Sequence, residues 1–104
     1  MNQEIITGNL TADPELRYSN SGMAICNFSI AYNHYKKDKD DEVSFFNCVA
    51  FNKTAETIAQ HFKKGGKILI HGELKQSRWT TDDGQKRSKV EIIVQRFEFM
   101  GAKE

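Results

Sequence analysis

The sequence has few of the residues that build metal or disulfide sites. Its 104 residues include two cysteines, in no Cys-x-x-Cys pattern, and three scattered histidines. This spacing provides no set of metal ligands. Cys26 and Cys48 each lie within an apolar segment, which predicts buried, reduced thiols. We therefore expect no metal and no cofactor.

Long hydrophobic runs are also missing. No apolar run approaches the roughly 20 residues that cross a bilayer. The first residues, Met1–Glu4, lack the charged-then-apolar layout of a signal peptide. A chain of 104 residues has the length of one small domain. We expect a single domain over residues 1–104, located in the cytoplasm and without a membrane partner.

Groupings typical of enzymes are absent as well. The neighbouring acids of Asp82-Asp83 and of residues 40–42 diverge on adjacent positions, whereas paired acid–base catalysis needs them to converge. No histidine has an evident Ser or Cys partner, and Gly65-Gly66 is not a phosphate-binding glycine loop. We expect that the protein is not an enzyme.

Charge is nearly balanced overall but unevenly distributed. The net charge is only +1, which by itself argues against a general binder of polyanions. Residues 63–89, however, carry eight Lys or Arg against three acids, a local excess of +5, whereas residues 1–60 carry five against eight, a balance of −3. A basic region on a near-neutral protein is expected where backbone phosphates bind. The alternative is a solvated face of mixed charge.

Apolar alternation and turn signals predict five strands and one helix. The strands are expected at residues 3–10, 23–33, 43–51, 68–79 and 87–99, with the clearest alternation in the second. Between the third and fourth, Ala55, Ile58, Ala59 and Phe62 form one helical stripe. Asn52 is expected to cap this helix, two lysines lie in its last turn, and Gly65-Gly66 ends it.

This order predicts an all-β fold with one helix. A helix between the third and fourth of five strands is the layout of the OB-fold, a five-stranded Greek-key barrel that binds oligonucleotides or oligosaccharides on one face. A highly charged connection, residues 35–42, is expected to form a mobile hairpin arm.

Aromatic rings interleaved with cations carry the functional prediction. Trp79, the only tryptophan, has basic or polar neighbours and lies beside the turn Asp83-Gly84. An exposed flat ring among cations suits an unpaired nucleobase, and one stacked base contributes about 1–3 kcal/mol. The alternative is that this indole closes one end of the barrel. Tyr35, Phe45 and Phe51 are the other candidate rings.

The remaining aromatic residues are expected mainly in the core. Phe45 and Phe51 could serve either the core or the stacking surface, and one bulge would exchange Phe45 with Phe46. Phe46 is otherwise a candidate for the core or an interface. The rings assigned to the core are Phe28, Phe62, Phe97 and Phe99. The cations expected to follow the phosphates include Lys36, Lys37, Lys75, Arg78 and Lys86.

An ordered set of short motifs resembles the bacterial-type single-stranded DNA-binding protein family. The set covers nearly the whole chain and runs through Gly8-Asn9-Leu10, Asp13-Pro14-Glu15-Leu16-Arg17-Tyr18, Ala24 to Ala31 with Asn27, Phe45 to Phe51, Ala55-Glu56, Lys63-Lys64-Gly65, Gly72-Glu73-Leu74, and Trp79 with Asp83-Gly84-Gln85.

The resemblance implies sequence-tolerant binding and protection of single-stranded DNA in replication, recombination, repair or DNA transfer, at the nucleoid. Its four stacking positions fall on Tyr35, Phe45, Phe51 and Trp79. Its basic positions for the DNA backbone fall on Lys53, Lys64, Arg78 and Arg87. It also implies a homotetramer, with a dimer as the alternative, in which the first strand and the surface near Phe46 make subunit contacts.

The sequence departs from that family in two places. Longer members carry a flexible extension with an acidic tip that recruits replication proteins, whereas this chain stops at Gly101-Ala-Lys-Glu104, which puts recruitment in doubt. Asn47 stands where some relatives have a basic residue. Two other functions stay open for the same barrel: a protein-docking or primosome-type accessory subunit, and an RNA-binding module.

Overall fold

The computed structural model describes residues 1–37 and 41–101. The elements, in chain order, are β1 (Glu4–Leu10), β2 (Glu15–Tyr18), β3 (Ala24–His34), β4 (Glu42–Phe51), α1 (Asn52–His61), β5 (Lys67–Thr80) and β6 (Lys86–Phe99). The middle of the charged connection predicted as an arm, residues 38–40, lies outside the described residues.

Five of the strands close into a barrel. The order β1-β5-β6-β4-β3 is completed by pairing of β1 with β3, at Asn9 with Ala31 and Leu10 with Ile30. All pairings are antiparallel except that of β4 with β6. The predicted OB-fold is therefore confirmed.

The short strand β2 was not predicted. It pairs with β3 outside the ring and places the helix between β4 and β5 when strands are counted along the chain. All four of its residues are exposed, and its alternation, Glu15-Leu16-Arg17-Tyr18, spans only four residues, the shortest length that indicates a strand. Tyr18 at its end donates a hydrogen bond to Glu56 of α1, at 3.2 Å, which ties this strand to the helix.

The core fills the barrel along the predicted inward positions. Ala24, Cys26, Phe28 and Ile30 of β3 are all buried, as their alternation predicted. They pack with residues from β4, β5, β6 and α1 in one cluster. Among the described residues no polar or charged side chain is buried. Because the interior is purely apolar, any polar chemistry must take place on the surface.

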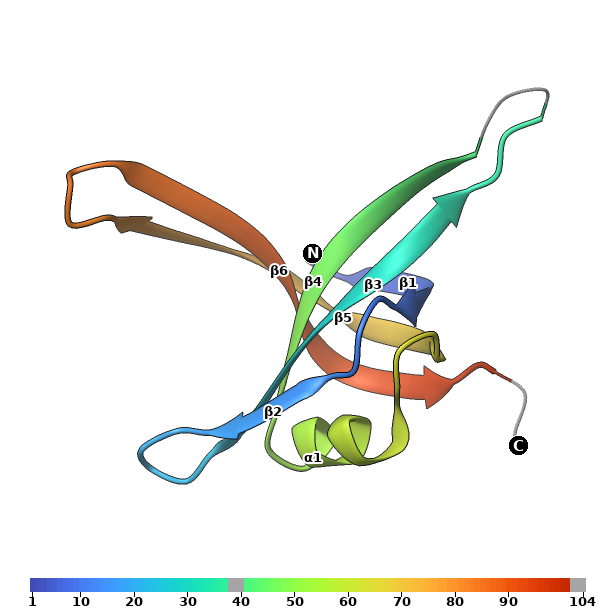
Figure 1. Cartoon of the computed structure of the whole chain (residues 1–104), viewed down its shortest axis with the longest axis horizontal. Helices are drawn as coiled ribbons and strands as arrows, with labels where there is room; N and C mark the ends of the chain where they lie inside the picture. Colours follow the sequence, from blue (N-terminus) through green and yellow to red (C-terminus); the bar gives the residue numbers. More distant parts are fainter. Residues whose placement is uncertain (38–40, 102–104) are drawn as a thin grey trace.

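Helix α1 covers one end of the barrel (Figure 1). Ala55 and Ile58 of the predicted stripe are buried, and Phe62 is buried just after the helix. The predicted cap is wrong: Phe51 occupies the N-cap position without a side-chain hydrogen bond, and Asn52 begins the helix with φ of 59°. The helix ends at His61, so the two lysines expected in its last turn lie beyond it.

An aromatic cluster lies beside this end of the barrel. The rings of Phe62 and Phe99 stack with centroids 4.6 Å apart, and Phe97 meets both edge-on. Phe97 packs partly buried against the core. Assignment of Phe99 to the core was wrong, because this side chain is 57 % exposed. It lies at the last position of β6, where it meets the rings of His61, Phe62 and Phe97 but is otherwise open to solvent.

Two hairpins extend beyond the barrel in different directions (Figure 1). We call residues 32–37 and 41–45 the β3–β4 arm and residues 74–92 the β5–β6 arm. The pairing of β5 with β6 runs over thirteen positions, with one register shift between His71 and Gly72, and its last seven pairs belong to the β5–β6 arm. These arms carry most of the residues singled out in the sequence.

Candidate nucleic-acid interface

Strand register places two of the predicted rings on one face of the sheet. Side chains of paired residues point to the same face, and faces alternate along a strand. Phe45 pairs with Ala31 and Phe51 pairs with Ile25, so both rings lie on the face opposite the core. We call this the outer face. Tyr35 follows the end of β3, and its hydroxyl accepts a hydrogen bond at 3.4 Å from the side-chain amide of Asn33, which lies on the outer face.

Strand register also places Trp79 on the outer face, through the pairing of β4 with β6 and of β6 with β5. Val49 of β4 pairs with Ile93 of β6, and Ile93 pairs with Glu73 of β5. Trp79 is six residues from Glu73 and pairs with Arg87. An even separation keeps the face, so all four predicted rings belong to one continuous surface.

Exposure agrees with this arrangement. The side chains of Tyr35, Phe45 and Trp79 are 79 %, 66 % and 45 % exposed, whereas Phe51 is half-buried. Phe46 packs partly buried against the core. The ambiguity between Phe45 and Phe46 is thereby resolved, because no register shift interrupts the pairing of β3 with β4.

The four rings are separated from each other. No ring contact joins any two of them among the described residues. Phe45 and Phe51 lie six positions apart on β4, roughly 20 Å at the usual rise of a strand. Tyr35 and Phe45 belong to the β3–β4 arm, and Trp79 belongs to the β5–β6 arm. Such spacing leaves each ring free to receive a separate planar group.

A hollow at the end of the β5–β6 arm combines the indole with cations. It has a volume of about 370 Å³ and is lined by Arg78, Trp79, Thr80, Lys86, Arg87 and Ser88. Three of these six residues carry a positive charge and none carries a negative one. A flat ring beside three cations suits a base with its phosphate.

The turn that joins β5 to β6 is held by its own hydrogen bonds. The backbone N–H of Thr81 donates to the carbonyl of Gln85 at 2.8 Å, and the N–H of Gln85 donates to the Thr81 hydroxyl at 3.0 Å. Gly84 has φ of 87°, which suits glycine. The Thr81 hydroxyl also donates to the Asp83 carboxylate and, as the leading cause, lowers the pKa of that group.

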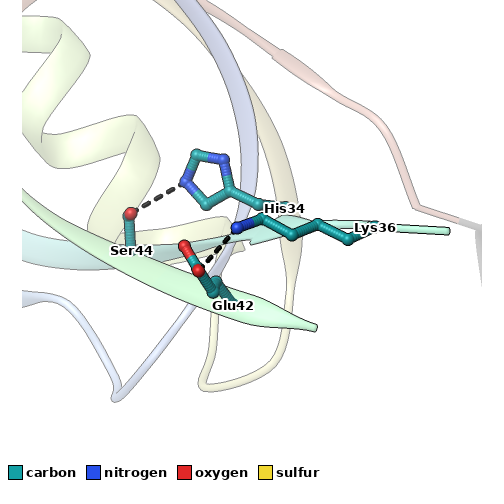
Figure 2. A network of polar contacts seen from close by, with 4 residues as sticks. All are labelled: His34, Lys36, Glu42 and Ser44. Atoms are coloured by element: carbon teal, nitrogen blue, oxygen red, sulfur yellow. Dashed lines mark hydrogen bonds and ion pairs between the residues drawn. The ribbon is translucent and has the colours of Figure 1, made fainter. Parts of the chain in front are cut away.

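A polar network braces the β3–β4 arm on its other face (Figure 2). The imidazole of His34 shares a hydrogen bond with the Ser44 hydroxyl, at 2.8 Å, and Tyr32 packs edge-on against it. The ammonium of Lys36 lies 2.6 Å from the Glu42 carboxylate. Part of the positive charge predicted for this arm is therefore already neutralised.

The predicted basic residues fall into three groups. Lys75 and Arg87 share the outer face with Trp79, whereas Arg78 and Lys86 alternate onto the opposite face of the arm. Lys36 and Lys37 are exposed beyond the end of β3.

Two further lysines lie outside the arms. Lys53 is exposed in the first turn of α1, next to Phe51. Lys64 lies in the loop after α1, where its backbone N–H donates to Asp13 at 2.8 Å. The structure thus brings some of the predicted cations to the rings and leaves Lys64 apart from them.

One cation on the outer face was not singled out from the sequence. Lys89 pairs with Ser77, two positions from the pair of Trp79 and Arg87. Its ammonium lies 3.6 Å from the Glu91 carboxylate. Lys89 was counted in the basic segment 63–89, but its face follows only from the pairing of β5 with β6.

The part of the chain that the structure describes contains no cluster of metal ligands. Within residues 1–37 and 41–101, no group of three or more His, Cys, Asp or Glu side chains could hold a metal ion. Cys26 and Cys48 are buried free thiols, as predicted. No helix in the described part of the chain is long and apolar enough to cross a membrane.

Comparison with known proteins shows that the chain is similar to the members of one protein family. The family described as single-strand binding proteins matches residues 1–100. A protein from Treponema pallidum (strain Nichols), named single-stranded DNA-binding protein, is 42 % identical and covers 98 % of this chain. Proteins of the same name from Clostridium perfringens and Wolinella succinogenes are 39 % and 43 % identical and cover 96 % and 98 % of it. The chain spans 59 %, 66 % and 65 % of these three relatives.

Proposed function

Because this chain belongs to the single-strand binding protein family, we propose that it binds single-stranded DNA on the outer face of its barrel. Binding occurs without catalysis and without a cofactor. Its cellular role is to coat exposed strands, protect them and prevent their re-pairing during replication, recombination, repair or DNA transfer.

One observation carries the proposal: four aromatic rings, from β4, from β5 and from the residue that follows β3, occupy one continuous face. Tyr35, Phe45, Phe51 and Trp79 would each stack on a base, and each stacked base is worth about 1–3 kcal/mol. Every base has a π-face, so binding should tolerate any sequence.

Cations near the rings supply the second part of the mechanism. Lys75 and Arg87 flank Trp79 on the outer face, and Lys53 follows Phe51. Each phosphate that a cation neutralises releases bound counterions, so the affinity should fall steeply as salt rises. Lys36 contributes less than its position suggests, because Glu42 competes with a phosphate for its ammonium.

The proposal includes assembly into a homotetramer. Support comes from the side of the barrel that bears β1, where Ile5 is exposed beside a hollow of about 420 Å³. The hollow is lined by Ile5, Leu69, His71, Arg96, Phe97 and Glu98. An exposed isoleucine beside a partly apolar hollow on a strand surface fits contact with a second copy. Measurement of the solution mass over a range of concentrations tests this part.

Tryptophan fluorescence gives the most direct test of DNA binding. Addition of oligo(dT) should quench the emission of Trp79, the only tryptophan, in a saturable way. The same titration with RNA of equal length distinguishes a DNA-binding protein from an RNA-binding module. Duplex DNA serves as the control, because its bases are already stacked and should quench weakly. Lack of saturable quenching by either single strand, together with no salt dependence, would contradict the proposal.

A further inference from the structure

The two faces of the β5–β6 arm differ in the acids that lie beside their cations. On the outer face of the arm, between residues 74 and 92, Lys75, Arg87 and Lys89 are opposed by Glu91, a net charge of +2. The opposite face, which we call the back face, carries Arg78 and Lys86 and no acid between residues 74 and 92 outside the turn, a net charge of +2. The face without the tryptophan is therefore as positive as the outer face, and its cations have no acid beside them on that face.

The two cations of the back face are available to a ligand. Neither Arg78 nor Lys86 belongs to an ion pair within the described part of the chain. The guanidinium of Arg78 donates only to the neutral amide oxygen of Gln76, at 3.0 Å. Both side chains are exposed. By contrast, Lys89 on the outer face already has Glu91 as a partner.

The back face also continues directly into the outer face. The hollow at the end of the arm is lined by Trp79 and Arg87 from the outer face and by Arg78 and Lys86 from the back face. Near the barrel, the back face exposes the aliphatic side chains of Leu74 and Val90. Aliphatic surface followed by unpaired cations can accommodate both the sugars or bases and the phosphates of a flexible strand.

We propose that the back face of the β5–β6 arm is a second track for the DNA backbone, so that a strand stacked on Trp79 continues around the arm onto Arg78 and Lys86. The inference rests on the proposed function. It adds that the arm contacts two successive stretches of one strand, one on each face. A short strand occupies the outer face first, and only a longer strand reaches the back face fully.

Two double variants with equal changes in charge test the second track. Arg78→Gln with Lys86→Gln removes two cations from the back face, and Lys75→Gln with Arg87→Gln removes two from the outer face. All four residues are exposed, so both variants should keep the fold, which thermal unfolding checks. Affinity is measured by fluorescence for oligo(dT) of about 6 and about 16 nucleotides, near the limits for one OB-fold.

The inference predicts a dependence on length for the back-face variant alone. With the long strand it should lose about fivefold or more in affinity, and the slope of log affinity against log salt should fall by about 1.4, since each contact to single-stranded DNA contributes about 0.7. Its loss with the short strand should be clearly smaller. The outer-face variant should lose similar factors with both strands.

Three results would overturn the inference. One is an equal loss for both lengths in the back-face variant, and another is no loss for either length. The third is a changed assembly mass with an unchanged salt slope, which would make the back face a contact between protein copies. Failure of the parent protein to bind either strand would instead overturn the proposed function, and the inference with it.

Discussion

Trp79 lies on a hairpin that projects beyond the barrel, so its ring can be changed without disturbing the core. Its neighbours across the strand pair are polar or charged, and nearly half of its surface is exposed. The sequence context indicated this, because no apolar partner flanks the indole. A residue in such a place contributes little to folding and is free to serve binding.

Replacement of this ring gives the first prediction. Trp79→Ala should weaken binding of oligo(dT) by about 1–3 kcal/mol, the value of one stacked base. The free energy of unfolding should change little, because the side chain lies outside the core. Binding is measured by anisotropy of a labelled strand, since the variant has no tryptophan. Trp79→Phe is the control and should retain part of the affinity; an alanine variant that binds like the parent would contradict the stacking role.

Asn52 gives a second prediction at the scale of single residues. Its φ of 59° lies in the left-handed region, which costs most residues about 1–2 kcal/mol but is tolerated by Asn and Gly. Asn52→Gly should therefore keep the stability of the parent, whereas Asn52→Val should lower it by about 1–2 kcal/mol. Urea unfolding measures both. The side chain is exposed, so a loss of packing does not contribute to the difference between the variants. A valine variant as stable as the parent would contradict the prediction.

At the scale of elements, the backbones of β5 and β6 lie too close at Gly72 to admit a side chain. A Cβ atom at Gly72 would lie 2.0 Å from the carbonyl oxygen of Ile93, beside the register shift between His71 and Gly72. Backbone cannot move aside as a side chain can. The β5–β6 arm leaves the barrel just after this point, so Gly72 helps set its direction.

Gly72→Ala should therefore destabilise the barrel by at least about 3 kcal/mol, at the upper end of overpacking effects. Thermal or urea unfolding measures the loss. Gly101→Ala is the matched control, because the nearest atom to its Cβ would be Lys67 Cβ at 3.8 Å. That control should change stability by no more than about 0.5 kcal/mol. Similar stability of the two variants would contradict the prediction, because it would show that the backbones of β5 and β6 can move apart at Gly72.

The elements also show where sequence patterns were sufficient. Strong alternation predicted β3, and the helical stripe predicted α1. The short strand β2 was missed because its alternation spans only four residues. The cap at Asn52 was wrong because the turn from β4 into α1 uses a left-handed backbone rather than a capping side chain.

At the scale of the whole molecule, the two thiols report on global unfolding. Burial raises the pKa of Cys26 to about 11 and that of Cys48 to about 12, from an ordinary value of 9.0, with Glu91 adding to the second. Both side chains are almost completely enclosed in the core. Near pH 8 they should react with a thiol reagent only when the barrel opens. Labelling should therefore match the rate of global unfolding, and rapid labelling of the folded protein would contradict this.

The same pKa shifts set a pH dependence of stability. The folded state keeps thiol protons that the unfolded chain releases above pH 9. The contribution of the two protonated thiols to the free energy of unfolding is therefore complete below pH 9. It is lost as the pH rises from there toward the pKa values of the folded state. Urea unfolding at several alkaline pH values should show this decline, and Cys48→Ala should make it shallower. An unchanged slope in that variant would exclude the thiol as a cause.

The sequence by itself determined most of the residues that face the core and the succession of the five barrel strands along the chain, because side-chain polarity and strand periodicity are local properties. It could not decide between Phe45 and Phe46, nor separate Lys75 and Arg87 from Arg78 and Lys86. Those answers depend on which residues of different strands are paired. Hydrogen bonds between segments far apart in the chain fix that register, and only the tertiary structure contains them.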